Sequence, residues 1–170
     1  MPDLDILATH TPLGEIVARM TMAVLFGAVV GFDREVRQKA AGLRTHMLIA
    51  LAAAVFTLLT FELTASADAL GDAIRADPVR VTEAVVTGVA FLGAGTIIRA
   101  GGSVHGITTG ASIWMTGAVG TACGGGFYVI AGIALAFVIF ILTVVGLVEA
   151  RLIRHLKGRK APVSNPSDSD

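Results

Sequence analysis

Hydrophobic residues along this chain form long blocks that are separated by short polar breaks. The blocks cover residues 13–32, 46–63, 81–98, 107–123 and 127–148. Each is close to the roughly 20 residues that an α-helix needs to cross the hydrocarbon of a bilayer. The pattern therefore predicts an all-α polytopic membrane helix bundle with about five transmembrane helices.

The polar breaks divide the chain into three parts. Residues 1–12 are expected to be a short N-terminal segment, and residues 13–148 the transmembrane bundle. Residues 149–170 are expected to be a basic cytoplasmic segment that ends in a disordered tail rich in Pro, Ser and Asp. Within the bundle we expect a polar connection at 64–80, a short turn at 99–106 and a tight glycine turn at 124–126.

Composition strengthens the membrane assignment. The chain is 54% hydrophobic and 15% charged, whereas soluble domains average about 25% charged residues. Its net charge of +0 gives no argument for a nucleic-acid partner, so membrane lipids are the expected surroundings. Cys123 is the only cysteine, which rules out an intrachain disulfide.

Basic residues predict the orientation of the helices, because Lys and Arg concentrate in cytoplasmic loops. Most of the 13 basic residues flank the first break, the 99–106 turn and the end of the last block. Five crossings bring all three segments to one side. We therefore predict an outer N-terminus, a cytoplasmic C-terminus and a multi-pass location in the bacterial inner membrane.

Small residues within the apolar blocks predict close helix packing. A missing side chain lets two membrane helices approach each other. The expected packing residues are Ala23, Gly27, Gly31, Gly88, Gly93, Gly95, Gly106 and Gly110. Because five short helices bury little area within one chain, we expect a homodimer or a larger homo-oligomer.

Polar residues at the ends of the blocks are the candidates for function, since ionisable groups near membrane depth are costly. The predicted topology brings one set to the cytoplasmic face, where it could form a single site or serve as topology determinants and helix caps. The members of this set are Asp33, Arg34, Glu35, Arg44, Thr45, His46, Arg99, His105, Thr108 and Thr109.

On the outer side Glu83 is the candidate. Its carboxylate either faces the bundle as a cation or proton contact, or lies at the interface paired with Arg80 or Arg19. Trp114 lies in the middle of a block, so we expect it to fill space between helices.

Enzymatic chemistry finds no support in the sequence. It contains no phosphate-binding loop, zinc-protease helix or nucleophile elbow. Asp33 and Glu35 alternate with basic residues, which is typical of salt-bridged loops and not of a carboxylate cage for Mg²⁺. No catalytic residue and no cofactor are therefore expected, and the sequence does not assign a metal site, although a link to Mg²⁺ stays open.

Three segments carry a resemblance to a known family. They are GFDREVRQKAAGLRTHMLIALAAA at 31–54, VVTGVAFLGAGTIIR at 85–99 and GITTGASIW at 106–114. In this order they resemble the signature of the MgtC/SapB family of bacterial inner-membrane proteins. Ala40, His105 and Gly110 stand where that family usually has proline, arginine and alanine.

The chain is most similar to the short, SapB-like form of the family, without the C-terminal soluble domain of full MgtC proteins. The resemblance implies a link to magnesium limitation and to survival inside host cells. It also implies a membrane partner such as the F-type ATP synthase.

Two functions follow as hypotheses. The first is a non-enzymatic regulator of another membrane protein, favoured by glycine-lined faces suited to helix–helix contact. The second is a small oligomeric transporter or channel for a cation or other small solute, favoured by glycine-interrupted spans and polar clusters at both ends.

Overall fold

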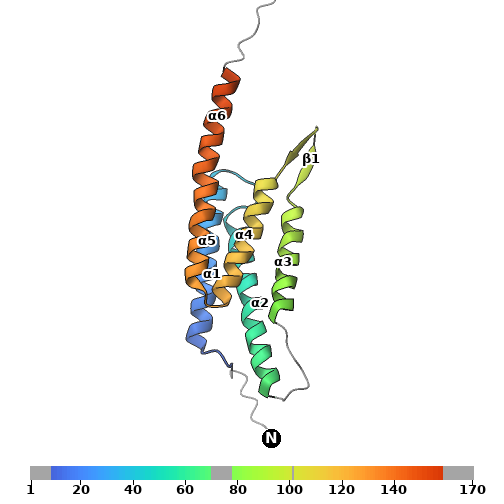
Figure 1. Cartoon of the computed structure of the whole chain (residues 1–170), viewed down its shortest axis with the longest axis vertical. Helices are drawn as coiled ribbons and strands as arrows, with labels where there is room; N and C mark the ends of the chain where they lie inside the picture. The colour runs from blue at the N-terminus through green and yellow to red at the C-terminus, as the bar shows by residue number, and fades with distance from the viewer. Residues whose placement is uncertain (1–8, 70–77, 101, 159–170) are drawn as a thin grey trace, which may run out of the picture.

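The structure is a computed structural model that describes residues 9–69, 78–100 and 102–158. Its helices are α1 (Leu13–Val36), α2 (Leu43–Ala69), α3 (Pro78–Ala94), α4 (Ile107–Gly124), α5 (Tyr128–Phe140) and α6 (Gly146–Gly158), with a π-helical turn, η1 (Ile141–Val145), between the last two. Two short strands, β1 (Ile98–Ala100) and β2 (Ser103–His105), join α3 to α4 (Figure 1). The predicted all-α bundle is confirmed.

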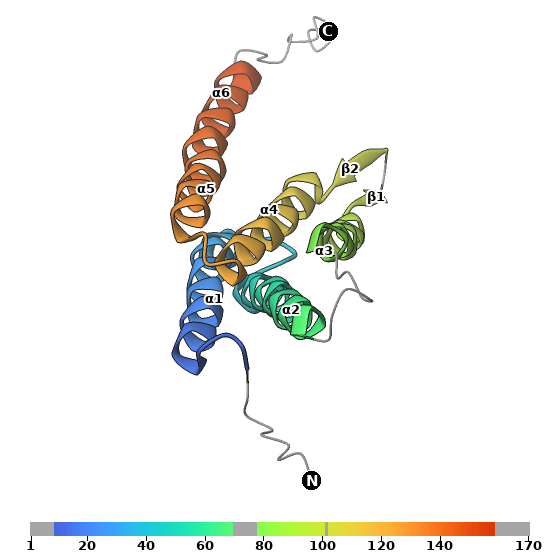
Figure 2. The ribbon, with the colours of Figure 1, turned by 60° about the horizontal axis from the view of Figure 1, so that its bottom comes forward.

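The centre of the bundle is built where α2 packs between α1 and α4 (Figure 2). A methyl group on Gly27 of α1 would lie 2.7 Å from the His46 carbonyl oxygen of α2. One on Gly124 of α4 would lie 2.6 Å from the carbonyl oxygen of Ala54. Because such distances leave no room for a side chain, glycine is what allows these backbones to touch.

The other expected packing residues fall into two groups. Gly31 contacts the backbone of Leu43, Gly93 and Gly110 contact each other between α3 and α4, and Ala23 is fully buried. Gly88 faces open space, and Gly95 and Gly106 lie outside the helices. The stripe of Ala23, Gly27 and Gly31 is therefore occupied by α2, and a contact between two copies would need another face.

The connection at 99–106 is a β-hairpin where the sequence predicts only a short turn. Ile98 pairs with His105 and Ala100 with Ser103 in an antiparallel register. β-Branched residues favour extended backbone on both sides, and Gly102 supplies the positive φ of +81° at the tip. The hairpin projects beyond α3 and α4 (Figure 1). We call this the hairpin end of the bundle and the opposite end the N-terminal end.

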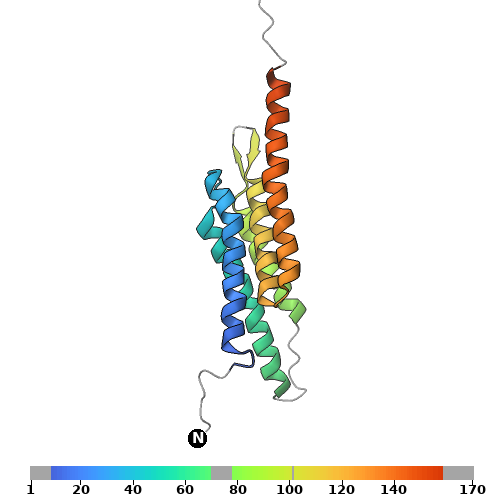
Figure 3. The same cartoon turned by 90° about the vertical axis from the view of Figure 1, so that its left-hand side faces the viewer.

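The last helix is longer than its apolar block. α5, η1 and α6 form one rod that runs from Tyr128 to Gly158 and extends past the other helices (Figure 3). The expected boundary between residues 148 and 149 thus falls inside a continuous rod. The predicted tail lies mostly at 159–170, outside the described residues.

The outer surface of the bundle has the character of a membrane protein. Large apolar side chains are widely exposed, for example Phe91, Val129 and Phe32. Three helical segments are long and apolar enough to cross a membrane, namely Leu13–Val36, Leu43–Ser66 and Tyr128–Glu149. Crossing by α3 and α4, and the orientation in the bilayer, stay predictions.

Glu62 anchors the start of the chain at the N-terminal end. Its carboxylate accepts the backbone N–H groups of His10 at 2.7 Å and Thr11 at 2.8 Å. We expect Glu62→Ala to speed hydrogen exchange of these two amides about tenfold, because two charge-assisted hydrogen bonds are lost. Glu83→Gln, at an exposed carboxylate of the same end, is the control. Unchanged exchange in Glu62→Ala would contradict the anchoring role.

Candidate functional site

A strip of polar side chains lies buried between the helices near the hairpin end. Thr109, Ser112 and Thr116 are spaced three and four residues apart and so share one face of α4. All three are buried; Thr109 contacts Arg34 of α1, and Ser112 contacts His46 of α2. Thr116 donates to the Ser112 carbonyl oxygen within α4. We refer to these five residues as the polar strip. It ties the three central helices together with side-chain hydrogen bonds in addition to glycine contacts.

His46 is the centre of the polar strip and is 0% exposed. Its Nδ1 lies 2.8 Å from the carbonyl oxygen of Gly42, and its Nε2 lies 3.1 Å from Ser112 Oγ. A carbonyl oxygen can only accept, so the proton must be on Nδ1. The Ser112 hydroxyl in turn donates its proton to the carbonyl oxygen of Thr109 at 2.8 Å. The ring thereby links the start of α2 to α4.

Arg34 comes from the last turn of α1 and is only 3% exposed. Its Nη2 donates a 3.3 Å hydrogen bond to Thr109 Oγ1. Its Nε is buried and has no hydrogen-bond partner among the described residues. A buried guanidinium with an unused donor is costly unless something else satisfies it.

Beside Arg34 lies a cavity of about 710 Å³ that is open on one side, which we call the basic cavity. Its walls come from the end of α1, the loop after it, the start of α4, and the η1–α6 part of the last rod. The charged residues that line it are Arg34, Arg37, Lys39 and Glu149, with His105 nearby on β2. Asp33 Oδ1 lies 2.8 Å from Arg37 Nε and partly neutralises that residue.

The structure divides the predicted cytoplasmic cluster. Arg34, His105, Thr108 and Thr109 line the basic cavity. Arg44 and Thr45 instead line a second cavity, of about 510 Å³, between α2 and α3.

The other members of the cluster have separate places. Glu35 accepts the Leu43 N–H at 2.9 Å and so stabilises the start of α2. Arg99 is exposed on β1. The ten residues thus share one end of the molecule but form no single site.

The structure places the outer-side candidate and the tryptophan on the surface. Glu83 is exposed on α3, in the manner of the interfacial alternative and not of the bundle-facing one. Arg19, offered as its partner, forms an ion pair with Glu15 and donates to the Gly124 carbonyl oxygen at 2.8 Å. Trp114 is 47% exposed and does not fill space between helices.

Sequence reasoning missed several residues of the site. Arg37 and Lys39 were used only to predict the topology, and Ser112 and Thr116 were not proposed as site residues. The signal for the last two was present, because polar residues at 109, 112 and 116 recur at helical spacing in an otherwise apolar block. No comparable signal marks the burial of Arg34.

The next question is whether these side chains could bind a metal ion. Within the described ranges, no three His, Cys, Asp or Glu side chains lie together in a way that could hold a metal ion. The basic cavity repels cations because Arg34, Arg37 and Lys39 outnumber Glu149. Its chemistry instead suits an anion.

Together the fold and the site define a small helical membrane protein with a buried polar strip and a basic cavity toward one end of the bundle. A family model described as "MgtC family" matches residues 20–151. This chain therefore belongs to the MgtC family, which confirms the resemblance drawn from its motifs.

Individual relatives agree with this assignment. "Protein MgtC" of Brucella abortus (strain 2308) is 39% identical over 128 residues, which cover 75% of this chain and 50% of that protein. "Putative magnesium transporter YhiD" of Escherichia coli (strain K12) is 40% identical over 115 residues, or 67% of this chain and 53% of that protein. The chain thus spans about half the length of these curated relatives. No solved structure matches it.

Proposed function

We propose that this protein is a non-enzymatic, multi-pass protein of the bacterial inner membrane that regulates another membrane protein. In this role it supports adaptation to low magnesium or survival inside host cells. Its family membership and a relative named as a putative magnesium transporter support the link to magnesium. The observation that carries the regulatory role is an apolar groove between α2 and α3.

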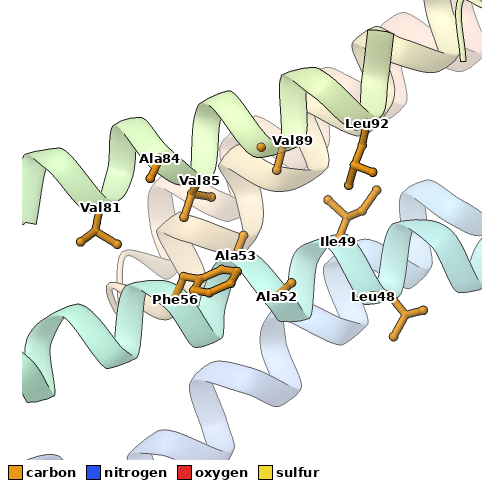
Figure 4. Close-up of a pocket in the computed structure, with 11 residues that line it drawn as sticks. Leu48, Ile49, Ala52, Ala53, Phe56, Val81, Ala84, Val85, Val89 and Leu92 are labelled. Carbon is orange, nitrogen blue, oxygen red and sulfur yellow. The ribbon is translucent and has the colours of Figure 1, made fainter. Parts of the chain in front are cut away.

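The groove has a volume of about 530 Å³ and opens on the side of the bundle. Figure 4 shows the side chains of α3 facing those of α2 across it. Its lining is entirely apolar and includes four small residues, Ala52, Ala53, Ala84 and Gly88. From Val81 to Leu92 the groove follows α3 for roughly 16 Å.

A transmembrane helix of another protein is the occupant that we propose for this groove. Membrane helices associate through small residues that permit close approach, and here such residues come from both walls. Gly88 has open space around its Cα, so it is free to receive a ridge from a partner. A groove lined by apolar side chains alone offers no charged or polar side chain to an ion.

Filling the groove is expected to abolish the function without unfolding the protein. We expect Gly88→Leu to lose growth at limiting magnesium in a strain that depends on this protein, because the new side chain occupies the partner's place. Gly132→Leu, at an equally open glycine on α5, should grow normally. Membrane levels and thermal unfolding of both variants verify that they fold.

Contact is tested with a photo-reactive amino acid at Ala52 in the groove and at Val129 on the far rod as control. We expect an adduct with one membrane protein from position 52 only, lost in Gly88→Leu. A subunit of the F-type ATP synthase is one identity that such an adduct would test. Normal growth of Gly88→Leu, or adducts with lipid or a second copy alone, would contradict the regulatory proposal.

The alternative is a small oligomeric transporter or channel for a cation or other small solute, and the polar strip is what favours it. Polar side chains inside a membrane bundle commonly line a substrate path. Flux of Mg²⁺ or another solute into vesicles that contain only the purified protein, abolished by Ser112→Ala, would favour this alternative. A homo-oligomer, which such a pore would need, is part of the same proposal.

A further inference from the structure

We propose that the basic cavity binds a phosphate-bearing anion, either the headgroup of an anionic phospholipid or free phosphate. This inference does not depend on the proposed regulatory function. It concerns the hairpin end of the bundle, whereas the apolar groove lies between α2 and α3. Three independent observations point to it.

The first observation is the start of α4, whose first turn lines the cavity. Gly106 precedes the helix with φ of +89°, and no side chain caps it. The first N–H groups of a helix have no partner within the helix, and together with the helix dipole they favour an anion. A helix start that lines a cavity without a capping side chain is therefore available for a ligand.

The second observation is Arg34. Arg34 lines the cavity and is only 3% exposed, yet its Nε has no hydrogen-bond partner among the described residues. Its hydrogen bond to Thr109 holds the guanidinium against the first turn of α4. A phosphate group in the cavity would lie against this guanidinium, and guanidinium groups match phosphate in charge and geometry.

The third observation is the charge and shape of the remaining walls. Arg37 and Lys39 add positive charge from the loop after α1, and Thr108 adds a hydroxyl. Among the described residues, Glu149 is the only acidic one in the lining, and Asp33 offsets part of the Arg37 charge. The lining therefore keeps a net positive charge even with both carboxylates ionised.

The opposite wall indicates what the anion is attached to. It is formed by Ile141, Leu142 and Val145 of the π-helical turn. Charged groups next to a continuous apolar wall suit a phospholipid, whose headgroup and acyl chain need both surfaces. Free phosphate would use the charged groups alone, and the experiment separates the two sources.

The test uses the purified full chain in detergent after removal of native lipid. Phosphatidylglycerol, phosphatidylcholine and inorganic phosphate are added separately, and binding is followed by native mass spectrometry and by thermal unfolding. We expect saturable binding of phosphatidylglycerol at least about tenfold tighter than that of phosphatidylcholine, because only the former carries net negative charge.

Lys39→Gln, at an exposed side chain, keeps the test independent of folding. We expect it to weaken phosphatidylglycerol binding roughly tenfold, the usual effect of losing one charge-assisted hydrogen bond. Arg44→Gln is the matched control, because it removes the same charge at the same end from the second cavity. It should change binding by less than about twofold.

The outcomes decide whether the basic cavity binds a phosphate-bearing anion and whether that anion is a lipid headgroup or free phosphate. Stabilisation by inorganic phosphate that Lys39→Gln removes, without any preference for phosphatidylglycerol, supports the site and assigns it to free phosphate. Preference for phosphatidylglycerol that Lys39→Gln removes supports it and assigns it to lipid. Equal loss in Arg44→Gln, or no preference for either phosphate-bearing anion, overturns the proposal. Neither overturning result affects the growth phenotype expected of Gly88→Leu.

Discussion

Replacing Gly120 by alanine is expected to destabilise the bundle by about 1–3 kcal/mol, the usual cost of overpacking a well-packed core. The added methyl group would overlap the carbonyl oxygen of Ala50 and lie 2.8 Å from its Cα. Backbone atoms cannot rotate away as a side chain can, so α2 and α4 would have to separate. Thermal unfolding in detergent, followed by Trp114 fluorescence, measures the effect.

Gly132→Ala is the matched control for this substitution. Both glycines lie inside helices, but a methyl group at position 132 meets nothing within 4 Å. Alanine there is expected to stabilise the protein by about 0.5–1 kcal/mol, because glycine is a poor helix residue. Equal stabilisation by the two substitutions would show that helix propensity, and not the contact between α2 and α4, dominates.

Removing the His46 side chain is expected to cost about 2–4 kcal/mol. The imidazole is fully buried, so His46→Ala leaves a cavity and also breaks the hydrogen bonds to Gly42 and Ser112. His155→Ala, at an exposed histidine on α6, should change stability by less than about 0.5 kcal/mol. Reversible unfolding in mixed detergent gives both values.

A double-mutant cycle isolates the hydrogen bond between α2 and α4. Ser112→Ala is combined with His46→Ala, and the two effects should fall short of additivity by about 1 kcal/mol. Full additivity would mean that the bond between Nε2 and Oγ contributes nothing. In that case the fit of the imidazole alone would explain the cost of His46→Ala.

Some elements of this fold can be predicted from the sequence, and others cannot. The apolar blocks predict the helices because their length matches the bilayer and their breaks are polar. The hairpin at 98–105 escaped prediction, since three residues per strand are too few for a reliable periodicity. The continuation of the last rod into α6 was not predicted, because the basic residues after position 148 were interpreted as the end of the helix.

The sequence predicts at which end of the bundle the candidate site lies, but not which of its residues come together. Asp33, Arg44 and His105 lie at that end as predicted from the breaks, yet only His105 lines the basic cavity. Which way each side chain points depends on the rotation of its helix. In a membrane, lipid-facing positions are as apolar as core positions, so apolar residues do not reveal that rotation.

By itself, the sequence determined that this chain is a helical membrane bundle of the MgtC family with its charged residues at the helix ends. Only the tertiary structure decided that Arg34 is buried with an unused donor, that His46 joins α2 to α4, and that Trp114 faces outward. The physical reason is that hydrophobic pattern sets how deep a residue lies in the membrane. Contacts between helices, made here through glycine and backbone carbonyl groups, set what that residue touches.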